Sequence, residues 1–326
     1  MTSPNVNTVD MNALFSTTLQ NYQPTLVDNI FKDLVLLNHL NSGGRVVMEE
    51  GGTQIVEPVL YEANTTAASY SGYDNIALTP QEGITAAIYD WKQIAASIAI
   101  SGIEEAQNRG TEAIIKLLNA KIMQAEMSIK SLVNGQLLSS NDGTGGTAKE
   151  FNGIGGFAGS SNTSIGGIDA ATNTWWNPTI PAGIQNATLS LVNMANVYNN
   201  ASKGNDTPDL IITTEALFSK FESLLTPNVR YQDVAKANSG FQNLMFKQTP
   251  VVFDLAMPGN QVSNASMYFL NTKYLKLTGM NGHWWTTTPF QQGTVAQKDA
   301  RYAIVLAYGQ LTCSNRARQG YLSADA

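Results

Sequence analysis

The chain has few of the side chains that most often carry chemistry. Its 326 residues include one cysteine, Cys313, and two histidines, His39 and His283. A single cysteine excludes a disulfide framework and every metal site built from several cysteines. Neither histidine has a cysteine or the other histidine near it in sequence, so the chain shows no spacing typical of metal ligands. We therefore expect no catalytic residues, no metal and no cofactor.

Charged residues are also scarce, at 13% of the chain, whereas soluble domains carry about 25%. The 19 basic and 25 acidic side chains give a formal net charge of −6. This balance argues against a strongly basic nucleic-acid reader, because such proteins need clustered Lys and Arg to neutralise phosphates. Because the cores of protein interfaces are depleted in charge, the composition favours a protein whose surface is largely covered by other chains.

Long hydrophobic runs are absent as well. The longest, residues 94–100 (IAASIAI), is far shorter than the roughly 18 residues of a membrane span. The first ten residues (MTSPNVNTVD) contain neither the basic nor the apolar region of a secretion signal. We therefore expect a soluble protein made in a reducing cytoplasm, without a membrane partner.

Two strands are predicted on either side of a polar segment. The first covers residues 53–61 (TQIVEPVLY), and the second begins at residue 84 and continues to residue 91 (ITAAIYDW) or as far as residue 100. Pro58 cannot donate a ladder hydrogen bond, so the first strand should lie at a sheet edge or a bulge. With the tip between them, residues 62–83, the two strands form a long arm. A two-stranded ribbon is marginal in water, so we expect the arm to lie on a surface outside its own domain.

A long helix is the clearest predicted element. Ser101-Gly102-Ile103-Glu104 matches the S-x-x-E capping box, in which each outer side chain binds the other residue's free backbone N–H. Apolar residues at helical spacing follow as far as Val133, and Asn134-Gly135 predicts the end of the helix. About 30 residues at 1.5 Å each give a rod about 45 Å long.

Shorter elements complete the prediction. They are an amphipathic helix over residues 26–40, a glycine-rich loop over residues 143–167, helices over residues 181–200 and 215–225, and strands over residues 209–213, 251–254, 267–270, 274–277 and 303–313. Strands mixed with helices, without regular βαβ repetition, predict an α+β fold.

Other candidate motifs have structural interpretations. Residues 153–158 (GIGGFA) fit G-x-G-x-x-A. The dinucleotide fingerprint also needs a preceding strand and an acidic residue about 20 residues further on, where this chain has Pro178. We interpret this motif as a flexible loop.

Paired acidic residues occur at positions 49–50 and 104–105, and we interpret them as parts of a turn and of a helix start. Paired tryptophans occur at positions 175–176 and 284–285, and we interpret them as parts of cores or interfaces.

In this order, the predicted elements resemble the major capsid protein of tailed bacteriophages, whose fold is shared with encapsulins and the floor domain of herpesvirus capsid proteins. Four stretches carry the resemblance: residues 101–138 are similar to the spine helix, residues 244–254 (LMFKQTPVVFD) to a strand-turn-strand, residues 267–277 (MYFLNTKYLKL) to a hairpin, and residues 299–322 (DARYAIVLAYGQLTCSNRARQGYL) to the closing strand and its Arg-Gln-Gly tail. The resemblance covers nearly the whole chain.

The resemblance implies an α+β capsid fold in four parts. These are an N-terminal arm (1–44), an extended loop with flanking strands (45–100), a peripheral domain with the spine helix (101–150 and 301–326), and an axial domain (151–300). Some relatives cross-link a lysine of the extended loop to an asparagine of a neighbour. No Lys or Arg occurs from Val46 through Trp91, so we expect this cross-link to be absent here.

The resemblance also implies a structural protein rather than an enzyme. Copies of the chain would form the hexamers and pentamers of an icosahedral shell, assembled in the host bacterial cytoplasm, that encloses double-stranded DNA and contacts it non-specifically. Separate scaffolding, portal and decoration proteins are the other expected partners. The candidate inter-subunit contacts are Ile55, Val59, Tyr61, Tyr70, Tyr73, Tyr89, Trp91, Arg316 and Arg318.

Three other functions stay open. An encapsulin-like compartment would use the same fold to package an enzyme, and a tail-tube protein would form filaments instead of closed particles. An enzyme would bind a nucleotide through residues 153–158. The contents and shape of the assembled particle separate the first two from a capsid, and nucleotide binding tests the third.

Overall fold

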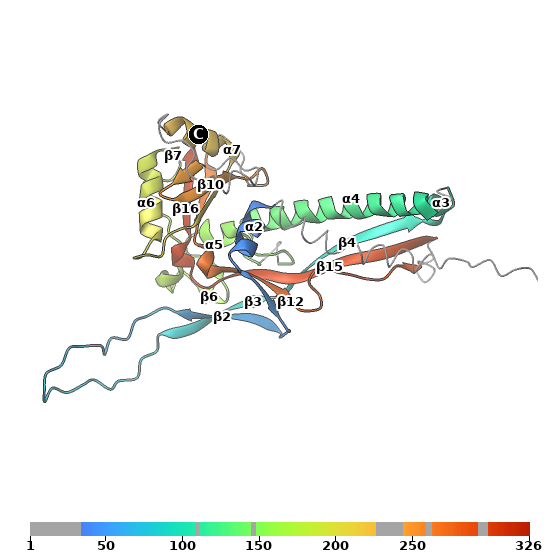
Figure 1. Ribbon diagram of the computed structural model, residues 1–326. Helices are drawn as coiled ribbons and strands as arrows, with labels where there is room; N and C mark the ends of the chain where they lie inside the picture. The colour runs from blue at the N-terminus through green and yellow to red at the C-terminus, as the bar shows by residue number, and fades with distance from the viewer. Residues whose placement is uncertain (1–33, 108–110, 145–147, 226–243, 259–262, 293–298) are drawn as a thin grey trace, which may run out of the picture.

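The computed structural model describes residues 34–107, 111–144, 148–225, 244–258, 263–292 and 299–326. Three parts are visible in Figure 1: a long sheet beneath a long helix, a second sheet with two further helices, and a two-stranded hairpin that projects away from the rest of the protein.

The first sheet is organised around β15 (Ala300–Cys313), a strand of 14 residues. β4 (Lys92–Ser101) runs antiparallel along the first part of β15, and β12 (Leu275–Met280) pairs with its last residues. The sheet is completed by β1 (Val46–Glu49), β13 (Thr286–Thr287) and β14 (Gln291–Gln292). The apolar run near the C-terminus therefore lies at the centre of a sheet, as its composition predicted.

The chain changes sheets at Trp91. β3 (Ile84–Asp90) ends one residue before it and pairs with β2 (Gln54–Leu60), whereas β4 begins one residue after it and pairs with β15. The indole of Trp91 donates to the carbonyl of Gly52 at 3.0 Å. The prediction of a single strand from residue 84 to residue 100 is therefore wrong, because the two halves of this segment pair with different strands.

The predicted long helix is present as α3 (Gly102–Gln107) and α4 (Thr111–Leu138). Its capping box is confirmed: the Ser101 N–H donates to Glu104 Oε2 at 3.1 Å, and the Glu104 N–H donates to Ser101 Oγ at 3.3 Å. α4 lies against β4 (Figure 1). It buries an apolar stripe that consists of Leu118, Ile122, Ala125, Ile129, Val133 and Leu137.

The helix end predicted at Asn134-Gly135 is wrong. α4 continues to Leu138, and Leu137 and Leu138 are both buried. The Asn134 amide also donates to the Asp254 carboxylate at 3.0 and 3.1 Å. These contacts of the last turn outweigh the low helix propensity of glycine, which costs about 1 kcal/mol relative to alanine.

The second sheet has the strand order β7-β16-β11-β8-β10-β9. Its strands are β7 (Ala187–Thr188), β16 (Gly320–Asp325), β11 (Ala265–Leu270), β8 (Leu210–Thr213), β10 (Thr249–Phe253) and β9 (Leu244–Phe246). The helices α6 (Leu191–Ala201) and α7 (Glu215–Leu224) contribute to its apolar core. The prediction of one helix over residues 181–200 is wrong. Residues 187–188 pair with β16, and Ser190 caps the start of α6.

The sheets do not follow the predicted boundary at residue 300. β12, β13 and β14 precede that boundary but lie in the first sheet with β15. β16 follows it but lies between β7 and β11 in the second sheet. The C-terminal segment therefore contributes one strand to each of the two sheets.

The remaining elements are short. They are α2 (Val35–Ser42), α5 (Ile154–Ala158), β5 (Ser164–Ile165), β6 (Ile168–Asp169) and the 3-10 turns η2 (Thr174–Trp176), η3 (Thr272–Tyr274) and η5 (Arg316–Arg318). α2 covers the end of the predicted helix over residues 26–40, and residues 26–33 of that prediction lie outside the described residues. None of the helices in the described ranges is long and apolar enough to cross a bilayer.

The glycine-rich motif at residues 153–158 is a packed helix, and its interpretation as a flexible loop is wrong. All five residues of α5 are buried. A Cβ on Gly153 would lie 2.1 Å from the Ser139 carbonyl oxygen, and one on Gly156 would lie 2.1 Å from the Asn141 carbonyl oxygen. Glycine is required here because two backbone segments touch.

Alanine should have opposite effects at two helical glycines. Gly135→Ala should stabilise the protein by about 0.5–1 kcal/mol, because no atom beyond the adjoining residues and the helix's own backbone lies within 4 Å of the added methyl group and alanine is the better helix former. Gly156→Ala should destabilise it by about 1–3 kcal/mol, because backbone must move. Urea unfolding of the unassembled chain measures both, and equal shifts of the two midpoints would contradict the packing described for α5.

Candidate functional site

The hairpin of β2 and β3 projects away from the rest of the described chain (Figure 1). The two strands pair antiparallel from Gln54 opposite Asp90 to Leu60 opposite Ile84, and residues 61–83 extend beyond them (Figure 1). The predicted strand-tip-strand arm is therefore confirmed. β2 and β3 form a separate sheet of two strands, so its two faces can be considered in turn.

The inner face of the hairpin packs on its own chain. Ile55, Val59, Ala87 and Tyr89 are all at most 5% exposed. The Tyr89 hydroxyl donates to the Cys313 carbonyl at 2.7 Å, and burial raises the pKa of Tyr89 well above its usual value, which keeps that proton in place. The expectation that the whole arm needs a surface outside its own domain is wrong for this face. Ile55, Val59 and Tyr89 have almost no free surface to offer a neighbour.

Glu57 anchors the inner face by polar contacts. It is 4% exposed, and its carboxylate accepts from Lys276 Nζ at 2.8 Å and from Thr312 Oγ1 at 3.1 Å. Lys276 and Thr312 lie directly opposite each other on β12 and β15, so one side chain of the hairpin bridges two strands of the first sheet. Glu57 is absent from the predicted contacts, although the sequence carries a signal for it: a charged residue on the same strand face as Ile55 and Val59.

The outer face of the hairpin is apolar and exposed. Its core is three directly opposed pairs, Val56 with Ile88, Pro58 with Ala86, and Leu60 with Ile84. We call the six residues of these pairs the outer strip. Leu60 and Ile84 are 74% and 75% exposed. The tip adds further exposed apolar side chains: Tyr70, Tyr73, Ile76 and Leu78. Contiguous exposed apolar surface of this kind marks an interaction site.

The other predicted contact residues have different surroundings. Tyr70 and Tyr73 are exposed at the tip, while Tyr61 and Trp91 are half-buried. Arg318 is half-buried and donates to the Ala201 carbonyl at 3.4 Å.

The prediction that Arg316 contacts a neighbouring subunit is wrong, because this side chain is 0% exposed. Its guanidinium donates to the backbone carbonyls of residues that surround the end of α5, at 3.0–3.2 Å: Gly156, Phe157, Ser160 and Thr163. It also donates to the Thr163 hydroxyl at 3.0 Å. Buried charges persist where hydrogen bonds satisfy them, so this arginine serves the interior of the fold.

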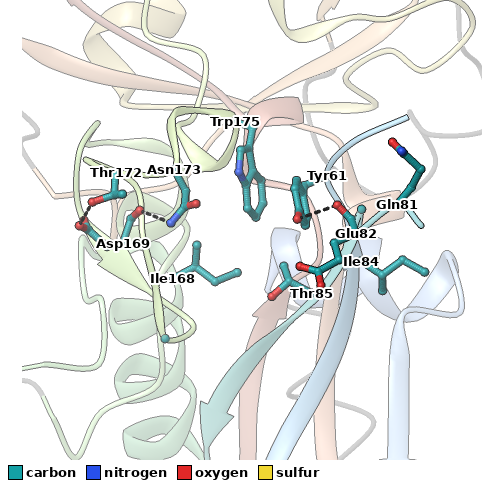
Figure 2. Close-up of a pocket in the computed structure, with 12 residues that line it drawn as sticks. Tyr61, Gln81, Glu82, Ile84, Thr85, Ile168, Asp169, Thr172, Asn173 and Trp175 are labelled. Atoms are coloured by element: carbon teal, nitrogen blue, oxygen red, sulfur yellow. Dashed lines mark hydrogen bonds between the residues drawn. The ribbon is translucent and has the colours of Figure 1, made fainter. Parts of the chain in front are cut away.

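A cleft of about 860 Å³ lies between the hairpin and residues 167–175, and Figure 2 shows its walls. Tyr61, Glu82 and Ile84 are on the hairpin side, and Asp169 and Trp175 are on the other side. The rings of Tyr61 and Trp175 stack with centroids 4.9 Å apart and an interplanar angle of 17°. The Tyr61 hydroxyl donates to the Glu82 carbonyl at 2.9 Å.

Hydrogen bonds hold the pKa of Asp169 below its usual value. The largest contribution is the Thr172 hydroxyl, which donates at 2.8 Å, followed by the Ala171 N–H at 3.0 Å. Asp169 is therefore a carboxylate at neutral pH. Within the described ranges, no three Asp, Glu, His or Cys side chains come together as a metal site.

Replacing Glu57 should loosen the hairpin root without unfolding the protein. In Glu57→Gln, the backbone amides of β2 and β3 should exchange with deuterium about tenfold faster, because losing a hydrogen bond to a charged group costs at least about 1.5 kcal/mol. Amides of β8 and β11 should not change. The control is Glu62→Gln, an exposed residue beyond the end of β2; equal exchange in both variants would contradict the anchoring role.

Two neighbouring arginines should differ in their contribution to stability. Arg316→Met should lower the free energy of unfolding by about 3 kcal/mol or more, because several buried carbonyls lose their donors. Arg318→Met should change it by less than about 1 kcal/mol, since one long hydrogen bond is lost. Urea denaturation followed by circular dichroism measures both, and a small effect at Arg316 would contradict its interior role.

The fold has relatives among solved structures, although no protein-family model and no curated protein matches the chain. A chain of the capsid asymmetric unit of cyanophage A-1(L) superposes with a TM-score of 0.65 at 17% sequence identity, over 86% of this chain and 90% of that chain. A chain of the capsid of a native GTA particle gives 0.58 at 13% identity, over 88% and 90%. A chain from Mycobacterium phage Adephagia gives 0.52 at 12% identity, over 87% and 89%. The predicted α+β phage capsid fold is confirmed.

Proposed function

We propose that this chain is a major capsid protein of a tailed bacteriophage, which assembles with copies of itself into the hexamers and pentamers of an icosahedral shell around double-stranded DNA. Two observations support the proposal: the fold is that of capsid chains over most of their length, and the outer strip leaves apolar surface exposed at a projecting hairpin. The outer strip is the observation that carries the proposal.

Covering the outer strip supplies free energy for assembly. Burying one large aliphatic side chain that was exposed contributes about 1.5–3 kcal/mol, and the strip offers four: Val56, Leu60, Ile84 and Ile88. β2 pairs with β3 in a sheet of two strands, so its other edge also offers backbone groups to a partner. Tyr61, Tyr70, Tyr73, Trp91 and Arg318 remain proposed contacts beside the strip.

The charge of the chain suits a container for DNA. The formal net charge of −6 repels phosphates, so a shell of this protein would enclose DNA without binding it tightly. We propose a structural, non-enzymatic role in the virion, with assembly in the host bacterial cytoplasm. Separate scaffolding, portal and decoration proteins are the proposed partners, and non-covalent contacts would take the place of the lysine cross-link of some relatives.

Electron microscopy of the overexpressed, purified chain tests the proposal. Closed icosahedral particles are expected, and particles recovered from infected cells should contain DNA that nuclease cannot reach. Tubes would indicate a filament protein, and particles filled with a cargo enzyme would indicate a compartment. Either result would contradict the capsid proposal.

Polar substitutions in the outer strip should prevent assembly while leaving the chain folded. Leu60→Ser combined with Ile84→Ser removes an opposed pair from the strip, at a cost of about 1.5–3 kcal/mol per side chain in each contact. The expected result is a loss of particles in sedimentation, with an unchanged circular dichroism spectrum. Leu60→Met combined with Ile84→Val keeps the apolar surface and should assemble. Normal particles from the serine variant would refute the role of the strip.

A further inference from the structure

The cleft between the hairpin and residues 167–175 has an unbalanced charge. Among the described residues that line it, Glu82 and Asp169 are charged and none is basic. Asp169 is held ionised by the Thr172 hydroxyl and the Ala171 N–H, at 2.8 and 3.0 Å. Glu82 is exposed. Two carboxylates therefore border a volume of about 860 Å³, and the part of its lining that the structure describes contributes no positive charge.

Aromatic rings add a second reason for a positive occupant. Tyr61 and Trp175, one from each wall, stack directly on each other (Figure 2), so a further group can contact only the face of each ring that is turned away from the stack. A cation close to the face of such a ring gains about 0.5–1 kcal/mol at exposed sites and about 2 kcal/mol when desolvated. Tryptophan is the best of the aromatic side chains for this contact, and arginine is the cation found most often in it.

The cleft is continuous with the outer strip through Ile84. This side chain is 75% exposed, pairs with Leu60 in the strip, and also lines the cleft. A protein surface that covers the strip therefore reaches the mouth of the cleft.

The rest of the chain can supply the positive charge. Residues 46–91 contain no Lys or Arg and seven acidic residues: Glu49, Glu50, Glu57, Glu62, Asp74, Glu82 and Asp90. The remaining residues carry all 19 basic side chains and 25 − 7 = 18 acidic ones. The hairpin segment is thus formally negative, whereas the rest of the chain has a formal charge of 19 − 18 = +1 and contains all of the basic side chains that a second copy could supply.

We propose that the cleft binds an arginine or lysine side chain of a second copy of this chain, presented by the segment that covers the outer strip. This inference rests on the proposed assembly of the chain with itself. Glu82 supplies the exposed carboxylate, Trp175 and Tyr61 supply the ring surface, and a planar guanidinium can use both at once. The cleft then fixes where along the neighbour the hairpin docks, which the apolar strip cannot do because apolar contact is not directional.

Charge reversal tests the proposal in the full-length chain. Glu82→Lys should reduce the yield of particles about tenfold or more, because like charges at an interface cost several kcal/mol. The matched control is Glu62→Lys, which makes the same charge change at an exposed hairpin residue that does not line the cleft, and it should assemble as the unaltered chain does. Circular dichroism and urea unfolding check that both variants fold.

Cross-linking identifies the occupant directly. A benzophenone amino acid in place of Thr85, which lines the cleft, is irradiated in particles assembled from a mixture of isotopically light and heavy chains. The expected product joins a light to a heavy chain, at a peptide in which the attached residue adjoins an Arg or Lys. The cleft proposal would be overturned if every cross-link joined residues of the same chain. It would also be overturned if Glu82→Lys and Glu62→Lys gave equal yields of particles. Either result would leave the shell proposal standing. Absence of particles of the unaltered chain, from infected cells as well as after overexpression, would overturn both.

Discussion

A two-stranded ribbon has two faces, and in this protein the rest of the chain covers one of them. Ile55 and Val59 are buried on the inner face of the hairpin, while Leu60 and Ile84 are about three-quarters exposed on its outer face. A ribbon of this kind is marginally stable by itself, so the anchored face gives the hairpin its fixed structure. The free face leaves apolar surface in water, and burial of that surface is available only through another molecule.

The anchors explain how the hairpin keeps a defined direction. Glu57 and Tyr89, one from each strand, bind the neighbouring residues Thr312 and Cys313 near the end of β15. β15 is in turn paired along most of its length with β4, and α4 lies against β4. Hydrogen bonds to fixed partners are directional, so the long sheet and its helix set the position of the hairpin. Arg316, in the turn between β15 and β16, extends the same connected structure to α5.

Local signals in the sequence predicted much of the fold. The capping box at Ser101 and Glu104, the strands of the hairpin and the apolar run of β15 depend on neighbouring residues, and all are present. The face of the hairpin that packs inward could not be predicted in this way. Ile55 and Val59 alternate with Val56 and Leu60, so both faces are apolar in sequence. The residues of β15 that bind the inner face at Tyr89 and Glu57 lie more than two hundred positions further along the chain.

Arg316, the buried glycines and the cleft were missed for related reasons. A charged residue predicts a surface position, yet Arg316 is satisfied by carbonyls of residues 156–163, which only the fold places around it. Glycines predict flexibility, yet Gly153 and Gly156 allow backbone contact with residues 139 and 141. The walls of the cleft come from residues 61–85 and 167–175, whose meeting depends on the anchored hairpin.

Hydroxyl-radical footprinting of the unassembled and assembled protein, read out by mass spectrometry, tests the central claim most directly. Leu60 and Ile84 should be oxidised readily in the unassembled chain and be protected in the particle, while Ile55 and Val59 should be protected in both. Equal oxidation of Leu60 and Ile84 in the two states would show that no other copy covers the outer strip, and would contradict the role of the hairpin in assembly.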